Sequence, residues 1–314
     1  MTSTSVVFQI LFNGLMLGIQ YSLIAVGFTL FFGVLDVIHF AHGDVFMIGA
    51  FSSMVLITLF RLQTASGVSY IILLILIFIL SMVLVGGFGV LFERIAVKPV
   101  SKGSPVMSLL ATLGLGIAIR EAVRIFFPRG SESKRFPEIL SKLFSGKEAI
   151  KLGGTIFRFE NLLILIIGVI AIFLLGLYVN KTKMGLAIRA TAQNGEVAEM
   201  MGVNKNRIID ITFFIGSALA ALAGIMNGIY YNSIIFDMGA IAGVIGFSAA
   251  VVGGLGNIYG AIAGGFLFAF VESFSAAFIP RGSEFMDVIA FAVVILFLIF
   301  KPSGILGEKV YERV

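Results

Sequence analysis

The chain contains no cysteine and only two histidines, His39 and His42, among its 314 residues. Without cysteine it forms no disulfide, carries no thiol nucleophile and offers no thiolate ligand to a metal. Two histidines are too few for a zinc site unless distant carboxylates complete the ligand set. We therefore expect neither a metal nor another cofactor in this chain.

Charged residues are also scarce. They make up 12% of the chain, whereas 59% of its residues are hydrophobic, and soluble domains carry about 25% charged residues. Apolar runs recur along the whole sequence with no linker-like change in composition, so residues 1–314 are predicted to form one domain embedded in the lipid bilayer. The formal charge of +5 comes from basic residues scattered between apolar runs, a pattern that does not indicate nucleic-acid binding.

The apolar runs predict an all-α integral membrane protein with about eight transmembrane helices. Most of them are long enough to cross a hydrocarbon core of about 30 Å. The first run is expected to be a retained helix and not a signal peptide, because no Lys or Arg precedes Arg61. The predicted spans are 6–35, 45–60, 71–92, 106–127, 161–178, 208–230 and 285–300, with the apolar stretch 239–275 considered separately.

Residues 239–275 are too long for one straight crossing. At about 1.5 Å per residue they would extend about 55 Å, nearly twice the hydrocarbon core. The glycine-rich GGLGN sequence at 253–257 is the natural break. We predict two shorter helices that leave and return to the same face, either re-entrant or as two spans. Irregular backbone at membrane depth lines a cavity or is buried in protein, which makes Gly253, Gly254, Gly256 and Asn257 candidate passage residues.

Two long segments are polar. Residues 128–160 are expected to form a loop on one side of the membrane, with a short amphipathic helix at 136–144. Residues 181–207 are mixed in charge and compatible with helix. They are either a solvated connection or a docking element in which small residues seat a short helix in a partner's groove and charged residues form its rim. The candidate docking residues are Gly185, Arg189, Ala190, Glu196, Ala198, Glu199, Gly202 and Val203.

The DVIHFAHGD sequence at 36–44 places two acids and two histidines between apolar runs. As chemistry, Asp36 with His39, or His42 with Asp44, would form a proton relay or a metal pair. As structure, the same residues would lie at an interface and cap the next helix, with Asp44 near its positive N-terminus. We favour the structural interpretation, because His–Asp metal pairs without a third ligand are rare.

Four stretches together identify a family. They are NGLMLGIQYSLIAVGFTLFFGVLDVIHFAHGDVFMIGAF near the N-terminus, the segment at 181–207, AAVVGGLGNIYGAIAGG and KPSGILG. In this order they resemble the LivH-type permease subunits of bacterial branched-chain amino acid ABC importers, and the resemblance covers nearly the whole chain. His39 departs from the family pattern, because Asn usually precedes the FAHG motif there.

The resemblance implies a permease in the inner membrane of a bacterium or archaeon that translocates branched-chain or similar apolar amino acids. It implies as partners a second permease subunit or a second copy, two ATPase subunits and an extracytoplasmic binding protein. It also makes 181–207 a cytoplasmic coupling loop and 128–160 an extracytoplasmic loop, an orientation that the even distribution of Lys and Arg leaves open.

The chain has no Walker motif, so it is not expected to be an enzyme, and ATP and magnesium would bind to partners. Asn13, His39, His42 and the GGLGN break are expected to line or shape the passage. Two alternatives remain open from the residues. One is a permease of the same family for urea or short amides. The other is a self-sufficient secondary transporter that uses Asp36, His39, His42 and Asp44 for proton coupling.

Overall fold

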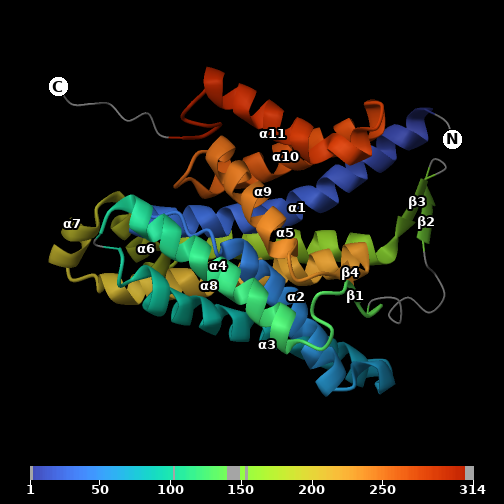
Figure 1. Ribbon diagram of the computed structural model, residues 1–314, viewed down its shortest axis with the longest axis horizontal. Helices are drawn as coiled ribbons and strands as arrows, with labels where there is room; N and C mark the ends of the chain where they lie inside the picture. The colour runs from blue at the N-terminus through green and yellow to red at the C-terminus, as the bar shows by residue number, and fades with distance from the viewer. Residues whose placement is uncertain (1–2, 102, 140–148, 153–154, 308–314) are drawn as a thin grey trace.

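The computed structural model describes residues 3–101, 103–139, 149–152 and 155–307 as a bundle of long, roughly aligned helices (Figure 1). The long helices are α1 (Ser3–Leu35), α2 (His42–Leu59), α3 (Gly67–Phe92), α4 (Pro105–Phe126), α5 (Phe159–Lys181), α8 (Lys205–Tyr231), α9 (Met238–Gly253), α10 (Ile258–Phe278) and α11 (Gly282–Phe300). The shorter ones are η1 (Leu62–Thr64), η2 (Glu93–Val97), α6 (Lys183–Gln193) and α7 (Gly195–Met200).

Eight of these helices are long and apolar enough to cross a membrane, which confirms the predicted all-α membrane architecture. Their burial differs strongly. In the most apolar part of α1, 89% of the residues are buried, compared with 11% in α11. Helix α1 is therefore the centre of the bundle, packed against α8, α9 and α10, and α11 lies at its periphery.

The predicted break in the glycine-rich stretch is confirmed. Helix α9 ends at Gly253 and α10 begins at Ile258. Gly254 and Gly256 between them have φ angles of 106° and 89°, a backbone region that favours glycine. The chain beyond α11 closes over this turn, because the backbone N–H groups of Ile305 and Leu306 donate to the carbonyls of Val252 and Gly253.

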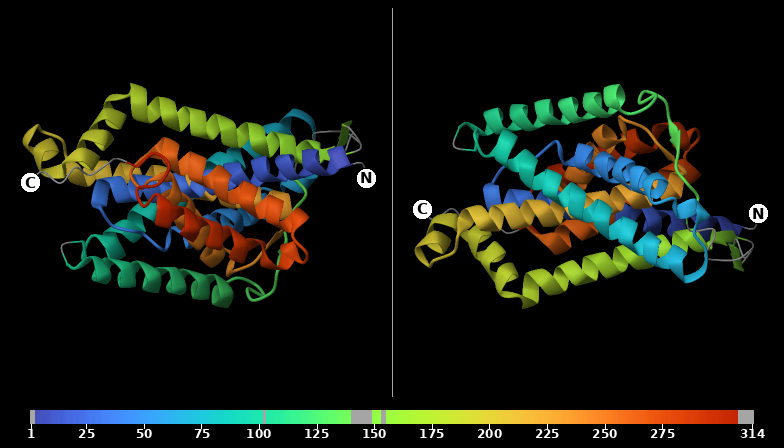
Figure 2. Two further views of the ribbon diagram at one scale, coloured as in Figure 1. Left: turned by 90° about the horizontal axis from the view of Figure 1, so that it is seen from above. Right: turned by 90° about the horizontal axis from the view of Figure 1, so that it is seen from below.

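The two ends of the bundle differ. Figure 2 shows α6 and α7 projecting at one end, and the α3–α4 connection and the C-terminal end of α11 lie at that same end. The start of α1 and the β2–β3 hairpin lie at the opposite end. We call these the α6–α7 end and the β2–β3 end. Helix α10 runs from the break toward the β2–β3 end, antiparallel to α1, whereas α9 begins beside Gly43 and Asp44 at the start of α2.

The segment 128–160 contains strands that the sequence analysis did not predict. Strand β2 (Ala149–Leu152) pairs antiparallel with β3 (Thr155–Arg158), and β1 (Lys134–Arg135) pairs antiparallel with β4 (Ser233–Ile234). The predicted amphipathic helix is wrong for 136–139, which are not helical, and its remaining residues lie outside those described. Phe136 and Ile139 are buried in the protein, so they are not available to lie on a bilayer surface.

Glycines allow a close contact between two core helices, α2 and α8. On α8, Gly224 packs directly on α2. A Cβ atom added at Gly224 would lie 2.0 Å from the carbonyl oxygen of Phe46, and one added at Gly49 would lie 2.3 Å from the Cα of Ala221. The α2 and α8 backbones therefore approach each other at positions where no side chain fits.

We expect Gly224→Ala to lower the free energy of unfolding by about 1–3 kcal/mol, because the added methyl group forces two backbones apart. The matched control is Gly114→Ala on α4, where an added Cβ meets nothing within 4 Å. There alanine should leave stability unchanged or raise it by up to about 1 kcal/mol. Thermal unfolding followed by circular dichroism measures both, since the chain has no Trp fluorophore. Equal effects at the two positions would contradict the packing argument.

Candidate functional site

Two capping side chains begin the helices of the α6–α7 segment. The Thr182 hydroxyl accepts a hydrogen bond from the Gly185 N–H at 3.0 Å and begins α6. The Asn194 side chain accepts from the N–H groups of Glu196 and Val197 and begins α7. Capping residues of this kind satisfy backbone donors that the helix itself leaves free. The segment is therefore two defined short helices and not a flexible connection.

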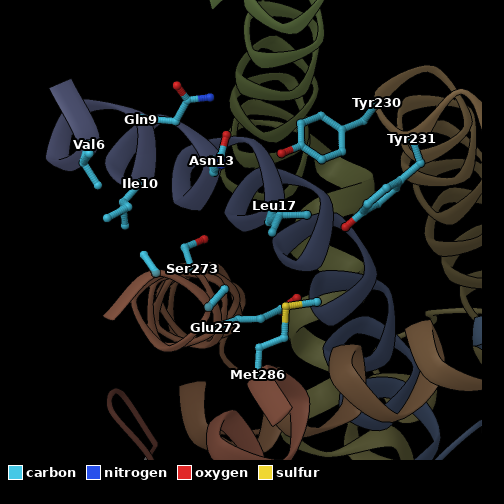
Figure 3. Close-up of a pocket in the computed structure, with 12 residues that line it drawn as sticks. Val6, Gln9, Ile10, Asn13, Leu17, Tyr230, Tyr231, Glu272, Ser273 and Met286 are labelled. Atoms are coloured by element: carbon cyan, nitrogen blue, oxygen red, sulfur yellow. The ribbon is translucent and has the colours of Figure 1, made fainter. Parts of the chain in front are cut away.

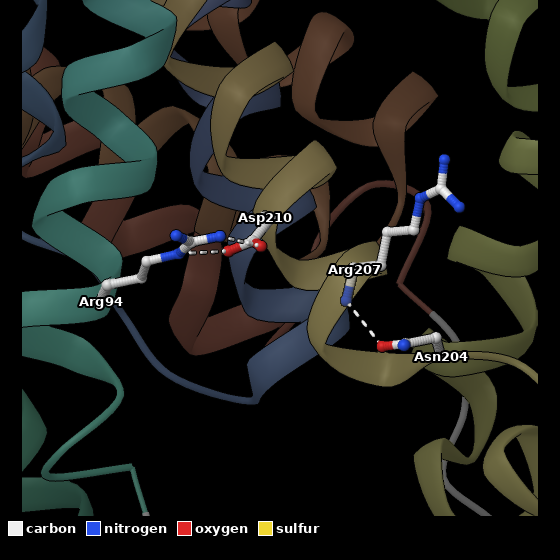
Figure 4. Close-up of polar contacts among 4 residues, drawn as sticks. All are labelled: Arg94, Asn204, Arg207 and Asp210. Carbon is white, nitrogen blue, oxygen red and sulfur yellow. Dashed lines mark hydrogen bonds and ion pairs between the residues drawn. The ribbon is translucent and has the colours of Figure 1, made fainter.

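The base of this segment is anchored to the bundle at the start of α8. Figure 4 shows Asn204 accepting a hydrogen bond from the Arg207 N–H and Arg94 meeting Asp210. Two nitrogens of the Arg94 guanidinium contact the two Asp210 carboxylate oxygens, at 3.3 and 2.6 Å. This bidentate pair links η2 to α8, and it fixes geometry more than it adds stability, because Arg94 is largely exposed.

The predicted coupling residues separate into two groups. Gly185 and Ala198 are buried, and a Cβ added at Gly185 would collide with the backbone of Val179. The Arg189 guanidinium donates a hydrogen bond to the same Val179 carbonyl, so it stabilises the α5–α6 junction. Five predicted residues remain at least partly accessible on this segment: Ala190, Glu196, Glu199, Gly202 and Val203.

The most exposed apolar side chains of the segment were missed by the sequence analysis. Met200 and Met201 are 84% and 81% exposed, and Leu186 and Val197 are also exposed. We call these four the apolar tip. The adjacent methionines at the end of GEVAEMM could have indicated these exposed residues. Large apolar side chains exposed on a polar segment are typical of a surface that binds another protein.

Two adjoining cavities lie beside the first two-thirds of α1. The outer cavity has a volume of about 430 Å³, and Figure 3 shows its lining from α1, α8, α10 and α11, with the Tyr230 and Tyr231 hydroxyls directed toward α1. Asn13, a predicted passage residue, lines it. The inner cavity has a volume of about 230 Å³ and shares Tyr231, Glu272 and Met286 with the outer one.

Beyond the inner cavity, toward the α6–α7 end, α1 contributes to a group of packed aromatic rings. Phe31 stacks on Phe213 with ring centroids 4.2 Å apart. The His42 ring meets the edges of Phe28 and Phe31 at 4.9 and 4.8 Å, and His39 lies 5.4 Å from Phe213. We call these five residues the aromatic cluster, and all of them are buried. Asn13 and Phe31 are about 27 Å apart along the helix, so the cavities and the cluster succeed each other along much of the bundle.

The two histidines thus lie in the aromatic cluster and not in a relay. Among the residues described, neither ring nitrogen of His39 has a hydrogen-bond partner. Asp36 is exposed beyond the end of α1, and the Asp44 carboxylate pairs with Arg120 of α4 at 3.0 Å. Asp44 does lie in the first turn of α2, as the structural interpretation expected, but its partner is a cation on another helix.

The GGLGN residues lie away from both cavities. The Asn257 side chain accepts a hydrogen bond from the Gly260 N–H and donates one to the Leu306 carbonyl. A Cβ added at Gly253 would lie 2.1 Å from the carbonyl oxygen of Gly260. In this conformation these residues hold the α9–α10 turn against Ile305 and Leu306, which follow α11. Within the described ranges, no group of three or more His, Asp or Glu residues is placed to hold a metal.

Comparison with known proteins gives matches over nearly the whole chain. The family described as "Branched-chain amino acid transport system / permease component" matches residues 10–298. The permease protein BraD of a high-affinity branched-chain amino acid transport system in Pseudomonas aeruginosa is 36% identical, over 98% of this chain and 97% of its own length.

More distant relatives agree. LivH of Salmonella typhimurium, from a high-affinity branched-chain amino acid transport system, is 34% identical over 98% of this chain and 97% of its own. A probable LivH permease of Methanocaldococcus jannaschii is 28% identical over 91% of this chain and 88% of its own. No solved structure matches the chain significantly.

Proposed function

The chain belongs to the family of permease components of branched-chain amino acid transport systems, and from this premise we propose that it forms part of the membrane passage for leucine, isoleucine and valine. These substrates combine an apolar side chain with one ammonium and one carboxylate group. The outer and inner cavities suit such molecules, because their walls are mainly apolar with a few polar groups. The relatives named for branched-chain amino acids favour these substrates over urea or short amides.

In this proposal the energy comes from other subunits. The sequence has no Walker motif, so ATP and magnesium bind to two partner ATPases. A second permease, either a sister subunit or another copy, completes the passage, and an extracytoplasmic binding protein delivers the amino acid at the β2–β3 end. The protein lies in the inner membrane with its α6–α7 end in the cytoplasm, and residues 128–160 face the binding protein.

The observation that carries this proposal is the projecting α6–α7 pair with its apolar tip (Figure 2). Two capped helices that end in highly exposed methionines are typical of a protein-binding surface and not of a solvated connection. A helix inserted in a groove of an ATPase buries such side chains and leaves Glu196 and Glu199 at the rim. Closure of the ATPase pair then moves α6–α7 as a unit against the ends of α5 and α8.

In this proposal the aromatic cluster closes the passage on its cytoplasmic side in this conformation. It lies between the cavities and the α6–α7 end, and its stacked Phe31 and Phe213 come from α1 and α8. Because α8 follows the α6–α7 segment directly in the chain, a movement of that segment is transmitted to Phe213. We propose that separation of the two rings opens the passage toward the cytoplasm while the β2–β3 end closes.

The test is reconstitution in liposomes with internal ATP-regenerating and external pH-controlled solutions. We expect leucine uptake only when both ATPases, the second permease and the loaded binding protein are present, and no uptake when the Walker lysine of the ATPases is replaced. The chain alone, with a pH gradient imposed, should take up no leucine. Uptake by the chain alone at the full rate would show a self-sufficient transporter and overturn the proposal.

A further inference from the structure

Glu272 is a buried carboxylate in the wall that separates the outer and inner cavities. It is 2% exposed and lies on α10, about 9 Å before the C-terminal end of that helix. Figure 3 shows it beside Met286 and Ser273 at the floor of the outer cavity. Ionisable side chains within a transmembrane helix are costly and mark functional sites by default.

The walls of the cavities are negative. Asp237 and Asp287 line the inner cavity together with Glu272. Among the described residues that line either cavity there is no lysine, arginine or histidine. Three carboxylates and no cation give a cavity that attracts positive charge and repels anions. A buried carboxylate is costly until a cation and hydrogen bonds compensate it, and here the chain itself supplies only part of that compensation.

The hydrogen bond that the chain itself supplies to Glu272 comes from α1. The Tyr21 hydroxyl donates a hydrogen bond of 2.8 Å to Oε2 of Glu272. Tyr21 is held in turn by the edge of Phe268, one helical turn before Glu272, with ring centroids 5.9 Å apart. The hydroxyl therefore orients the carboxylate through one oxygen and leaves Oε1 for a ligand.

The rest of the inner cavity fits the other end of an amino acid. The Asn227 amide donates to the Gln20 side chain at 3.3 Å, and both residues line the inner cavity. The rest of the lining is mainly apolar and includes Ile24, Ile241 and Ile245. A primary ammonium group with a branched alkyl chain matches this combination of acidic and apolar lining residues.

We propose that Glu272, oriented by Tyr21, binds the ammonium group of the amino acid during its passage between the two cavities. This assignment rests on the proposed function for the identity of the substrate, but its chemistry requires only a primary alkylammonium ion. The contact is a charge-assisted hydrogen bond, which is about twice as strong as a neutral one. The carboxylate thereby gives the permease a selectivity of its own, in addition to that of the binding protein.

The test uses the assembled transporter in nanodiscs, without binding protein or nucleotide. A hydrophobic carbodiimide modifies accessible intramembrane carboxyl groups, and mass spectrometry measures the rate at Glu272. We expect isoamylamine and leucine to slow this modification, and isocaproate, which is leucine without its ammonium group, to leave it unchanged. Protection by isoamylamine but not by leucine would support the ammonium site while refuting the branched-chain substrate.

A variant supplies the second measurement. Glu272→Gln keeps the side-chain volume and an acceptor for Tyr21 but removes the charge, and we expect ATP-driven leucine uptake to fall at least about tenfold with complex assembly retained. The control Glu284→Gln removes an exposed acid at the start of α11 and should transport normally. If neither amine nor leucine protects Glu272 and Glu272→Gln transports normally, the assignment is wrong while the permease function stands. If Glu272→Gln does not fold, protection in the unaltered protein decides.

Discussion

The double substitution Met200→Asp and Met201→Asp is expected to abolish co-purification of the ATPase subunits while the permease stays folded in the membrane. Both side chains are more than four-fifths exposed, so the change costs the isolated chain little. In the complex, each buried apolar anchor of this kind contributes about 2 kcal/mol or more to binding. Losing two of them and burying two charges should weaken the association more than about a hundredfold.

Affinity purification from membranes, with the ATPase quantified by immunoblot, measures the effect. The control is Asn206→Asp, which adds a negative charge to an exposed position in the first turn of α8 and removes no apolar surface. Negative charge is tolerated at a helix N-terminus, so this variant should bind the ATPase normally. Retention of the ATPase by the methionine double variant would refute the apolar tip as the docking site.

A second large effect is expected at the ion pair between α2 and α4. Asp44 is almost fully buried, whereas the Arg120 side chain is 25% exposed. The space around Asp44 is tight, since a Cβ added at Gly116 would lie 2.3 Å from its Oδ2. Arg120→Leu therefore leaves a carboxylate without a cation and without room to move, and we expect it to lower the free energy of unfolding by about 3 kcal/mol or more.

Removing the charge of Asp44 instead should lower the free energy of unfolding by less. In Asp44→Asn the unpaired group is Arg120, which is long and partly exposed, so it can direct its charge toward water. Combining Asp44→Asn with Arg120→Leu should recover part of the loss, because the double variant has no uncompensated charge. Thermal unfolding in detergent, followed by circular dichroism, measures all three variants.

A matched control lies one turn further along α4. Arg124 pairs with Glu121 at 2.5 Å, and both side chains are more than two-fifths exposed. Arg124→Leu should change the free energy of unfolding by less than about 1 kcal/mol, since exposed ion pairs contribute little. If Arg120→Leu is as mild as Arg124→Leu, the Asp44–Arg120 pair does not hold α2 against α4.

Much of the fold could be predicted from local sequence. The sequence predicted the membrane spans to within a few residues, because a long run of apolar side chains is stable only against lipid or against other apolar helices. The need for a break in 239–275 was predictable from its length, the position of the break from its glycines, and the α6–α7 segment from its polarity between two apolar runs. The β2–β3 hairpin and the β1–β4 pair were missed, because short strands in a polar loop carry no periodic apolar pattern.

The candidate site was only partly predictable. Asn13 was expected in the passage and does line the outer cavity, but Glu272 was left without a role. Its environment is set by Tyr21, 251 positions earlier in the chain. Similarly, the sequence placed Asp44 beside His42, whereas the structure pairs it with Arg120 on another helix.

By itself, then, the sequence determined the class of protein and the number and extent of its membrane helices, and it predicted a polar segment between two of them. These properties depend on composition and order along the chain, and hydrophobicity acts on each segment almost independently of the others. The tertiary structure alone decided which faces of those helices meet. That choice depends on the rotation of each helix about its axis, fixed by close contacts such as Gly224 against Phe46. It brought Tyr21 to Glu272, packed both histidines among phenylalanines and left two methionines exposed at the α6–α7 end.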